Sequence, residues 1–219
     1  RLMELPLGVF GVAVSTAVLP SLAEHVVKKE WGPFKESLSF ALRIVNFVII
    51  PSTLGLLILS TPIIDILFKR GEFGAADSSA TAIALYYYSV GLVPVAISRI
   101  LVSVFYSMKD SLTPVWVAFI AFVANAVFCV ALVGPLGHGG LALATSLSAL
   151  INMAVLFAIL RRKFGPFGGR AILSSAARSG AASVVMGVVI YLVMYRTGLY
   201  GSGQLVKTGL VVVCLVAGI

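Results

Sequence analysis

Charged residues are scarce in this chain: Asp, Glu, Lys and Arg make up 11% of its 219 residues, and only eight residues are acidic. Soluble domains carry roughly 25% charged residues, so this chain lacks the polar side chains that would cover a water-soluble surface. Apolar residues make up 60% of the chain, and its mean hydropathy is +1.09. The composition therefore excludes a soluble domain and predicts an integral membrane protein.

Cysteine and histidine are also few, with two residues of each type. Cys129 and Cys214 both lie within apolar runs and have neither metal-ligand spacing nor the pattern of a disulfide framework. His25 and His138 lie between apolar runs and belong to no recognisable catalytic motif with Ser or Cys. The sequence therefore predicts no metal site, no cofactor and no enzyme activity.

Seven long apolar runs divide the chain, each near the roughly 20 residues that a helix needs to cross the hydrocarbon core. Because lipid offers the backbone no hydrogen bonds, each run is predicted to be a helix, and the fold class all-α. The chain begins and ends inside apolar runs, so we expect an internal piece of a longer protein. The runs are Leu2–Ala23, Leu38–Leu59, Ala82–Tyr106, Val115–Val133, Gly140–Leu160, Ile172–Tyr195 and Leu205 to the end.

The net charge is +8, and the basic residues lie mostly between the apolar runs. They form no stripe with interleaved aromatic residues, so no nucleic-acid partner is expected. Alternate loops on one side hold most of them, which predicts that this side faces the cytoplasm and that the first helix runs inward. That side carries Lys28, Lys29, Lys35, Lys109, Arg161, Arg162, Lys163 and Arg170.

Prolines inside the first three spans predict helices that bend, as in transporters; they are Pro6, Pro20, Pro51 and Pro94. After the second span, Pro62–Arg70 predicts a short amphipathic helix at the outer interface, either a connector or a lid. In the sixth span, Ser175, Ser179, Ser183 and Gly187 recur every four residues and so share one face. This small-residue face predicts either close packing of another helix or a shallow groove for a lipid chain.

Charged residues within membrane spans are costly and usually functional. Arg1 and Glu4 stand three residues apart, so on a helix they share one face and can pair. They line a cavity that binds phosphate, or they lie at a helix end in the interface. Arg99 either snorkels to the headgroups or faces a cavity.

Neutral polar residues within the spans are expected to form interhelical hydrogen bonds; they are Asn46, Asn125, Thr145, Ser146 and Asn152. Asn125 and Thr145 have a second interpretation, as oxygen ligands of a sodium ion, because hard cations prefer oxygen.

Several motifs resemble those of the MurJ (MviN) lipid II flippases, and they occur in the same order. The opening stretch Arg1–Ala13, with Thr16 and Leu19–Leu22, is similar to a signature of that family. Further similarities are Phe68–Phe73, Tyr88–Leu92, Phe105–Asp110 with Thr113-Pro114, and Gly134–Ala144. The resemblance covers most of residues 1 to about 163; beyond that point it is mainly one of hydropathy.

The resemblance implies a fourteen-helix protein of the MOP exporter superfamily, with a MATE-like fold, in the bacterial cytoplasmic (inner) membrane. Residues 1–163 would hold its eighth to twelfth helices, and residues 164–219 its last two, which border a groove for the lipid tail. The substrate would be lipid II, an undecaprenyl-pyrophosphate-linked precursor of peptidoglycan, moved from the inner to the outer leaflet by alternating access. Na⁺ or the membrane potential would drive transport.

The resemblance also implies that Arg1 and Glu4 face a central cation-rich cavity that takes the headgroup, and we add Arg99 as a third candidate substrate-binding residue. The other partners expected are membrane lipids and the missing N-terminal half of the same protein. The alternatives are another exporter of the superfamily, either a polysaccharide-lipid flippase or a cation-coupled drug exporter, and a membrane scaffold protein that recruits cell-wall enzymes.

Overall fold

The computed structural model describes residues 4, 7–68 and 74–196. Within these residues all regular structure is helical: one π-helix and seven α-helices follow one another along the chain. The elements are η1 (Leu7–Gly11), α2 (Val12–Lys28), α3 (Trp31–Phe68), α4 (Ala75–Val90), α5 (Leu92–Ser107), α6 (Leu112–Leu136), α7 (His138–Phe164) and α8 (Gly169–Arg196). The predicted all-α fold class is therefore confirmed.

In the described part of the chain, α3, α6, α7 and α8 are each long and apolar enough to cross a membrane. Helices α4 and α5 together form a fifth candidate span, bent by 43° where they meet. The first predicted span corresponds to η1 and the 17-residue α2. The seventh, from Leu205 onward, lies outside the described residues.

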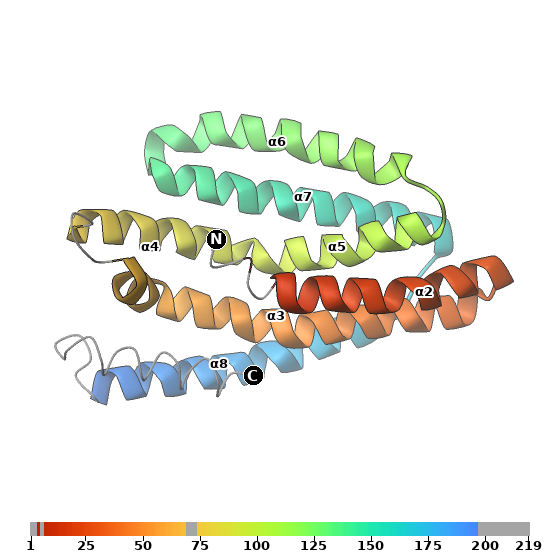
Figure 1. Ribbon diagram of the computed structural model, residues 1–219, viewed down its shortest axis with the longest axis horizontal. Coiled ribbons are helices and arrows are strands. Elements are labelled where there is room, and N and C mark those ends of the chain that lie inside the picture. Colours follow the sequence, from red (N-terminus) through yellow and green to blue (C-terminus); the bar gives the residue numbers. More distant parts are fainter. Residues whose placement is uncertain (1–3, 5–6, 69–73, 197–219) are drawn as a thin grey trace.

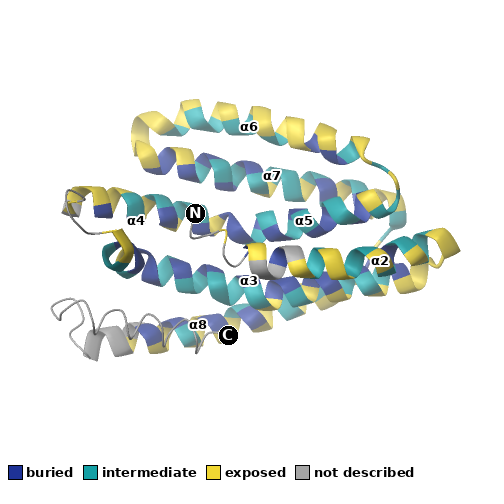
Figure 2. Cartoon of the chain, in the orientation of Figure 1, coloured by how far each residue is buried: buried dark blue, intermediate teal, exposed yellow. Residues whose placement is uncertain are grey.

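The helices run side by side as a bundle (Figure 1). Helices α2, α3 and α5 pack on one another, α7 packs on α5, and α8 packs on α3. Helix α6 packs mainly on α7, and Figure 2 shows that most of its surface is exposed. That surface is apolar, with residues such as Trp116 and Phe122 largely exposed, as expected for a helix that faces lipid.

The third predicted span bends at Gly91, which separates α4 from α5. Pro94 contributes to the break because it has no N–H and cannot bond to the carbonyl of Val90. Gly91 also lies directly against α7: a Cβ at this position would lie 3.0 Å from the Cα of Ser146. The Ser146 hydroxyl donates to the carbonyl of Tyr87 over 2.7 Å, so the bend is held against α7 by packing and by a hydrogen bond.

The prediction of a separate amphipathic helix at Pro62–Arg70 is wrong for the part that the structure describes. Helix α3 continues through Pro62 to Phe68 as one helix of 38 residues. Its last turns stay helical because Ile63 and Ile64 remain buried, and because Asp65 accepts a hydrogen bond from Ser78 of α4. At 1.5 Å per residue, α3 is roughly 57 Å long and extends beyond the hydrocarbon core.

The small-residue face of α8 packs against α3. Ser179, Ser183 and Gly187 are buried, and a Cβ at Gly187 would lie 2.7 Å from Cδ1 of Ile58. These contacts confirm the interpretation of this face as a site of close helix packing. A lipid-tail groove beside the last two helices stays a prediction, since residues 197–219 lie outside the described part.

The loops that carry the predicted cytoplasmic charges gather at one end of the bundle, on the right in Figure 1. They are the α2–α3, α5–α6 and α7–α8 connections. At the opposite end, α6 and α7 are joined by Gly137 alone, with φ at 53°. This left-handed backbone favours glycine and makes a tight turn between the two spans.

Candidate functional site

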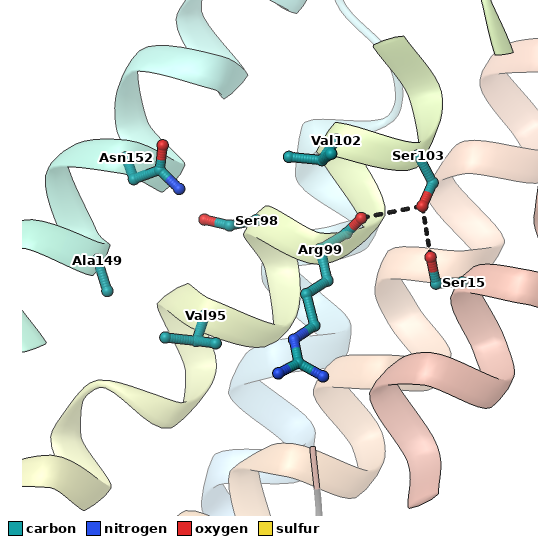
Figure 3. A pocket seen from close by; sticks show the side chains of 8 residues that line it. All are labelled: Ser15, Val95, Ser98, Arg99, Val102, Ser103, Ala149 and Asn152. Atoms are coloured by element: carbon teal, nitrogen blue, oxygen red, sulfur yellow. Dashed lines mark hydrogen bonds between the residues drawn. The ribbon is translucent and has the colours of Figure 1, made fainter. Parts of the chain in front are cut away.

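The candidate functional site is a cavity of about 380 Å³ between α2, α5 and α7 (Figure 3). Five of its eight lining residues lie on successive turns of one face of α5, because residues three and four apart are neighbours on a helix. The lining set is Ser15 from α2, then Val95, Ser98, Arg99, Val102 and Ser103 from α5, and Ala149 and Asn152 from α7.

Arg99 is the charged residue of this cavity and is partly buried. Its Nη1 lies 3.5 Å from the carbonyl oxygen of Leu7, to which it donates. Among the described residues, Arg99 forms no ion pair with a carboxylate. Of the two interpretations of Arg99, the structure therefore places this arginine at a cavity. The carbonyl of Leu7 is the acceptor that the described residues offer to its five donors, and a role in substrate binding stays a prediction.

Serine hydroxyls extend the polar surface beside Arg99. The hydroxyls of Ser15 and Ser103 lie 2.5 Å apart and link α2 to α5. The Ser103 hydroxyl also lies 3.1 Å from the backbone carbonyl of Arg99, as drawn in Figure 3. This chain of hydrogen bonds holds α2 against the turn of α5 that carries the guanidinium.

Two buried polar atoms at the cavity have no hydrogen-bond partner within the described part of the protein. They are Oγ of Ser98 and Oδ1 of Asn152, and both side chains point into the space between α5 and α7 in Figure 3. A buried polar atom without a partner costs on the order of 1–3 kcal/mol. The cavity is therefore suited to a ligand with polar groups.

The structure describes Glu4 but not Arg1. Glu4 is exposed and helical, close in sequence to η1, whose Leu7 accepts the hydrogen bond from Arg99. The predicted pairing of Arg1 with Glu4 lies outside the described residues and stays a prediction. The element η1, which begins three residues after Glu4, packs on α5.

Asn125 and Thr145 lie on α6 and α7, which pack together. The Asn125 amide nitrogen donates to Oγ of Ser148 over 3.2 Å, and its oxygen accepts from Sγ of Cys129 over 3.0 Å. The Thr145 hydroxyl donates to the carbonyl of Leu141 in its own helix. No group of three or more Asp, Glu, His or Cys suited to a metal occurs within residues 4, 7–68 and 74–196. The sodium site stays a prediction.

The expectation of interhelical hydrogen bonds is correct for Asn125 and Ser146. It is wrong for Thr145, which bonds within its helix. Oδ1 of Asn46 and of Asn152 has no partner in the described part of the chain. No pattern in the sequence indicates Ser15, Ser98 and Ser103, because serine is common in membrane helices. Only the packing of α2 on α5 brings the hydroxyls of Ser15 and Ser103 together.

Comparison with known proteins identifies the family. The family model described as "Lipid II flippase MurJ" matches residues 1–211. The chain belongs to the MurJ lipid II flippase family. The predicted family is therefore confirmed, and its description is that of a flippase and not of an enzyme. The structure is likewise that of a multi-pass membrane protein of this family.

Individual MurJ relatives agree with this assignment. A probable lipid II flippase MurJ of Vibrio cholerae is 37% identical over 83% of this chain and 36% of the relative. A probable lipid II flippase MurJ of Thermotoga maritima is 36% identical over 88% of this chain and 38% of the relative. A solved structure titled lipid II flippase MurJ, inward closed conformation, matches with a TM-score of 0.81 and 27% identity, over all of this chain and 44% of that one. The chain thus spans less than half the length of these relatives.

Proposed function

We propose that the full-length protein is a lipid II flippase of the bacterial cytoplasmic membrane, and that this chain forms part of the lobe that binds the lipid's headgroup. The observation that carries the proposal is the match to the MurJ family over residues 1–211. In this proposal, an undecaprenyl-pyrophosphate-linked muropeptide moves from the inner to the outer leaflet. The reaction is transport and breaks no covalent bond.

The cavity beside α5 supplies the chemistry that a pyrophosphate requires. The planar guanidinium of Arg99 can bind two phosphate oxygens at once, and a charge pair at a site shielded from water is stronger than one in bulk solvent. The hydroxyl of Ser98 and the amide of Asn152 then offer hydrogen bonds to polar groups of the ligand. Arg1 and Glu4 complete the proposed binding set at the start of the chain.

Alternating access requires an element with two arrangements. The α4–α5 span supports this proposal, because it is already bent by 43°, and the bend lies eight residues before Arg99. A change in the bend would alter how α5 presents Arg99 to the cavity. We further propose that residues 164–219 border the groove for the lipid tail, and that Na⁺ or the membrane potential drives the cycle.

The proposal is tested in bacteria depleted of their own flippase. The full-length gene is expressed as wild type, as Arg1→Ala and as Arg178→Ala, with membrane levels matched. Arg178 is exposed on α8 and lines none of the cavity, so its substitution is the control. Growth and the accessibility of lipid II at the outer leaflet are followed in each strain.

We expect wild type and Arg178→Ala to restore growth and externally accessible lipid II, and Arg1→Ala to restore neither. Lipid II would be rejected as the substrate by two results together. The wild-type protein would insert but fail to restore growth in this strain, and it would rescue a strain that lacks another lipid-linked glycan flippase. Rescue by Arg1→Ala equal to that by wild type would retain the flippase assignment and remove Arg1 from the binding set.

A further inference from the structure

A second, larger cavity lies at the predicted cytoplasmic end of the bundle and is separate from the site beside Arg99. Its volume is about 800 Å³, within the roughly 300–1,000 Å³ typical of ligand sites. It is enclosed by α3, α5, the end of α7 and the beginning of α8. The two cavities have no lining residue in common.

The walls of this cavity are mainly apolar. They comprise Ile50, Val93, Ile97, Phe157, Ile172 and Leu173. Because these side chains come from four helices, the cavity is a groove between packed helices and not a depression in one loop. Such walls suit a hydrocarbon chain.

Two arginines lie at the mouth of the groove: Arg161 at the end of α7 and Arg170 in the first turn of α8. Both are exposed, and neither forms an ion pair with any described carboxylate. The neighbouring Lys163, in contrast, is paired with Asp110 over 3.3 Å. The groove thus combines apolar walls with two cations that have no countercharge in the described part of the chain.

Asn46 adds a buried polar group to the wall. Its side chain is only 3% exposed, and its Oδ1 has no hydrogen-bond partner among the described residues. On the other side of the Pro166–Gly168 loop, Lys35 and Arg43 line an adjacent hollow with one acid, Glu36. The surroundings of the mouth are therefore strongly positive, which favours a ligand with a negative headgroup.

We propose that this groove binds an anionic phospholipid of the inner leaflet. Arg161 and Arg170 bind the phosphodiester, and an acyl chain occupies the apolar walls. A phospholipid of the surrounding bilayer fits better than a soluble phosphate, because the apolar volume would otherwise be empty. The bound lipid would fill the space between α8 and the rest of the bundle at the cytoplasmic side.

The test uses the full-length protein purified in detergent and titrated with synthetic phosphatidylglycerol or phosphatidylethanolamine, with bound lipid counted by native mass spectrometry. The test variant carries both Arg161→Gln and Arg170→Gln. The matched control is Arg162→Gln with Arg178→Gln, which removes the same charge from the same two helices at exposed positions outside the groove. A second pair carries no charge change: Ala176→Phe fills the groove, whereas Ala177→Phe lies outside it.

We expect phosphatidylglycerol to bind more tightly than phosphatidylethanolamine, and Arg161→Gln/Arg170→Gln to weaken its binding by roughly 30-fold. This value follows from about 1 kcal/mol for each basic residue near an anionic lipid and about 1.4 kcal/mol for a tenfold change. The charge control should stay within about threefold. Ala176→Phe should bind less lipid than Ala177→Phe, and this comparison still decides if the arginine variant does not fold.

If the two double arginine variants lost phosphatidylglycerol binding equally, the proposal would be overturned, because the overall positive charge of this end and not the groove would attract the lipid. No preference for phosphatidylglycerol, or unchanged binding in Ala176→Phe, would also overturn it. A last arm adds undecaprenyl pyrophosphate as competitor. If it displaces phosphatidylglycerol and itself requires Arg161 and Arg170, the groove belongs to the transported lipid, and the phospholipid proposal fails while the flippase proposal stands.

Discussion

At the scale of single residues, the proposed binding site depends on Arg99, because a cation within a membrane span requires a cavity, a partner or a ligand. The structure gives it a cavity lined by hydroxyls and one long hydrogen bond to Leu7. We expect Arg99→Gln to reduce transport by the full-length protein by about 30-fold or more, since removing one partner of a buried charge pair costs roughly 2–5 kcal/mol. Arg99→Lys should retain part of the activity, because lysine keeps the positive charge but lacks the planar guanidinium that can bind two oxygens at once.

The Arg99 prediction is measured as the initial rate of lipid translocation at matched protein levels, with Arg178→Gln as the control. If Arg99→Gln translocated lipid at the same rate as Arg178→Gln, Arg99 would only snorkel to the interface. A loss of folded protein in Arg99→Gln, with full activity in what remains, would likewise remove Arg99 from the binding set.

Asp110 ties the α5–α6 loop to the end of α7 outside the membrane spans. It accepts hydrogen bonds from the backbone N–H and hydroxyl of Thr113 and from Lys163. Partial burial opposes the charged form, yet the bonds from Thr113 and Lys163 outweigh it and lower the pKa of Asp110 below its usual 3.8. Its contribution to stability is therefore present above pH 3.8 and is lost as the pH falls through the lowered pKa of the folded protein.

We expect Asp110→Ala to lower the free energy of unfolding of the full-length protein by about 1 kcal/mol near pH 7, as for the loss of a helix cap. The difference from wild type should shrink as the pH is taken below 3.8. Thermal unfolding of wild type and variant in detergent, from pH 7 to below pH 3.8, measures the loss of stability and its dependence on pH. Lys163→Gln should lower the free energy of unfolding by less than Asp110→Ala does, because an exposed ion pair contributes little. If the difference in stability between Asp110→Ala and wild type grew toward acid pH, the stabilising role of the Asp110 carboxylate would be wrong.

At the scale of elements, the contact of the α4–α5 bend with α7 leaves little room for a larger side chain. A Cβ at Gly91 would lie 2.6 Å from Oγ of Ser146, whereas a Cβ at Gly55 in α3 would meet nothing within 4 Å. We expect Gly91→Ala to destabilise the protein by about 1–3 kcal/mol through overpacking. Gly55→Ala should instead be neutral or stabilising, by up to about 1 kcal/mol, since alanine favours helix.

Melting temperatures of the two glycine variants, measured in the same detergent, distinguish these effects. If Gly91→Ala is as stable as Gly55→Ala, α5 and α7 do not approach each other as closely as the structure shows. A variant that is unstable but regains stability when combined with Ser146→Ala would identify the Ser146 side chain as the source of the clash.

Much of the element pattern is predictable from the sequence, because lipid permits only a few backbone arrangements. The apolar runs at Val115–Val133, Gly140–Leu160 and Ile172–Tyr195 correspond to α6, α7 and α8. The continuation of α3 past Pro62 is not predictable from local sequence, because it depends on the burial of Ile63 and Ile64 in the packed bundle. The bend near Gly91 is indicated by Pro94, but the contact of the bend with Ser146, 55 residues away, is not predictable from local sequence.

The candidate site is predictable only in part. Arg99 stands out as a charge within an apolar run, and the family resemblance identifies Arg1 and Glu4. The hydroxyls of Ser15 and Ser103 come from helices that are far apart in sequence, so no local pattern indicates them. The π-helix η1, whose Leu7 carbonyl accepts a hydrogen bond from Arg99, also has no recognisable pattern in the sequence.

At the scale of the whole molecule, the orientation in the membrane follows from the basic loops at one end of the bundle. We expect a cysteine at Arg162 to be cytoplasmic and one at His138 to be outside; both positions are exposed. In the full-length protein with other cysteines replaced, a membrane-impermeant maleimide should label His138→Cys in intact spheroplasts and Arg162→Cys only after permeabilisation. The reverse pattern would invert the topology.

In the proposed function, the full-length protein moves lipid II between leaflets. The most direct measurement is translocation of fluorescent lipid II by the purified full-length protein in vesicles, read from the loss of fluorescence to an impermeant reductant. We predict protein-dependent translocation that Arg99→Gln reduces and Arg178→Gln does not. A wild-type rate no higher than that of protein-free vesicles, under an imposed Na⁺ gradient and membrane potential, would show that the protein does not move lipid II.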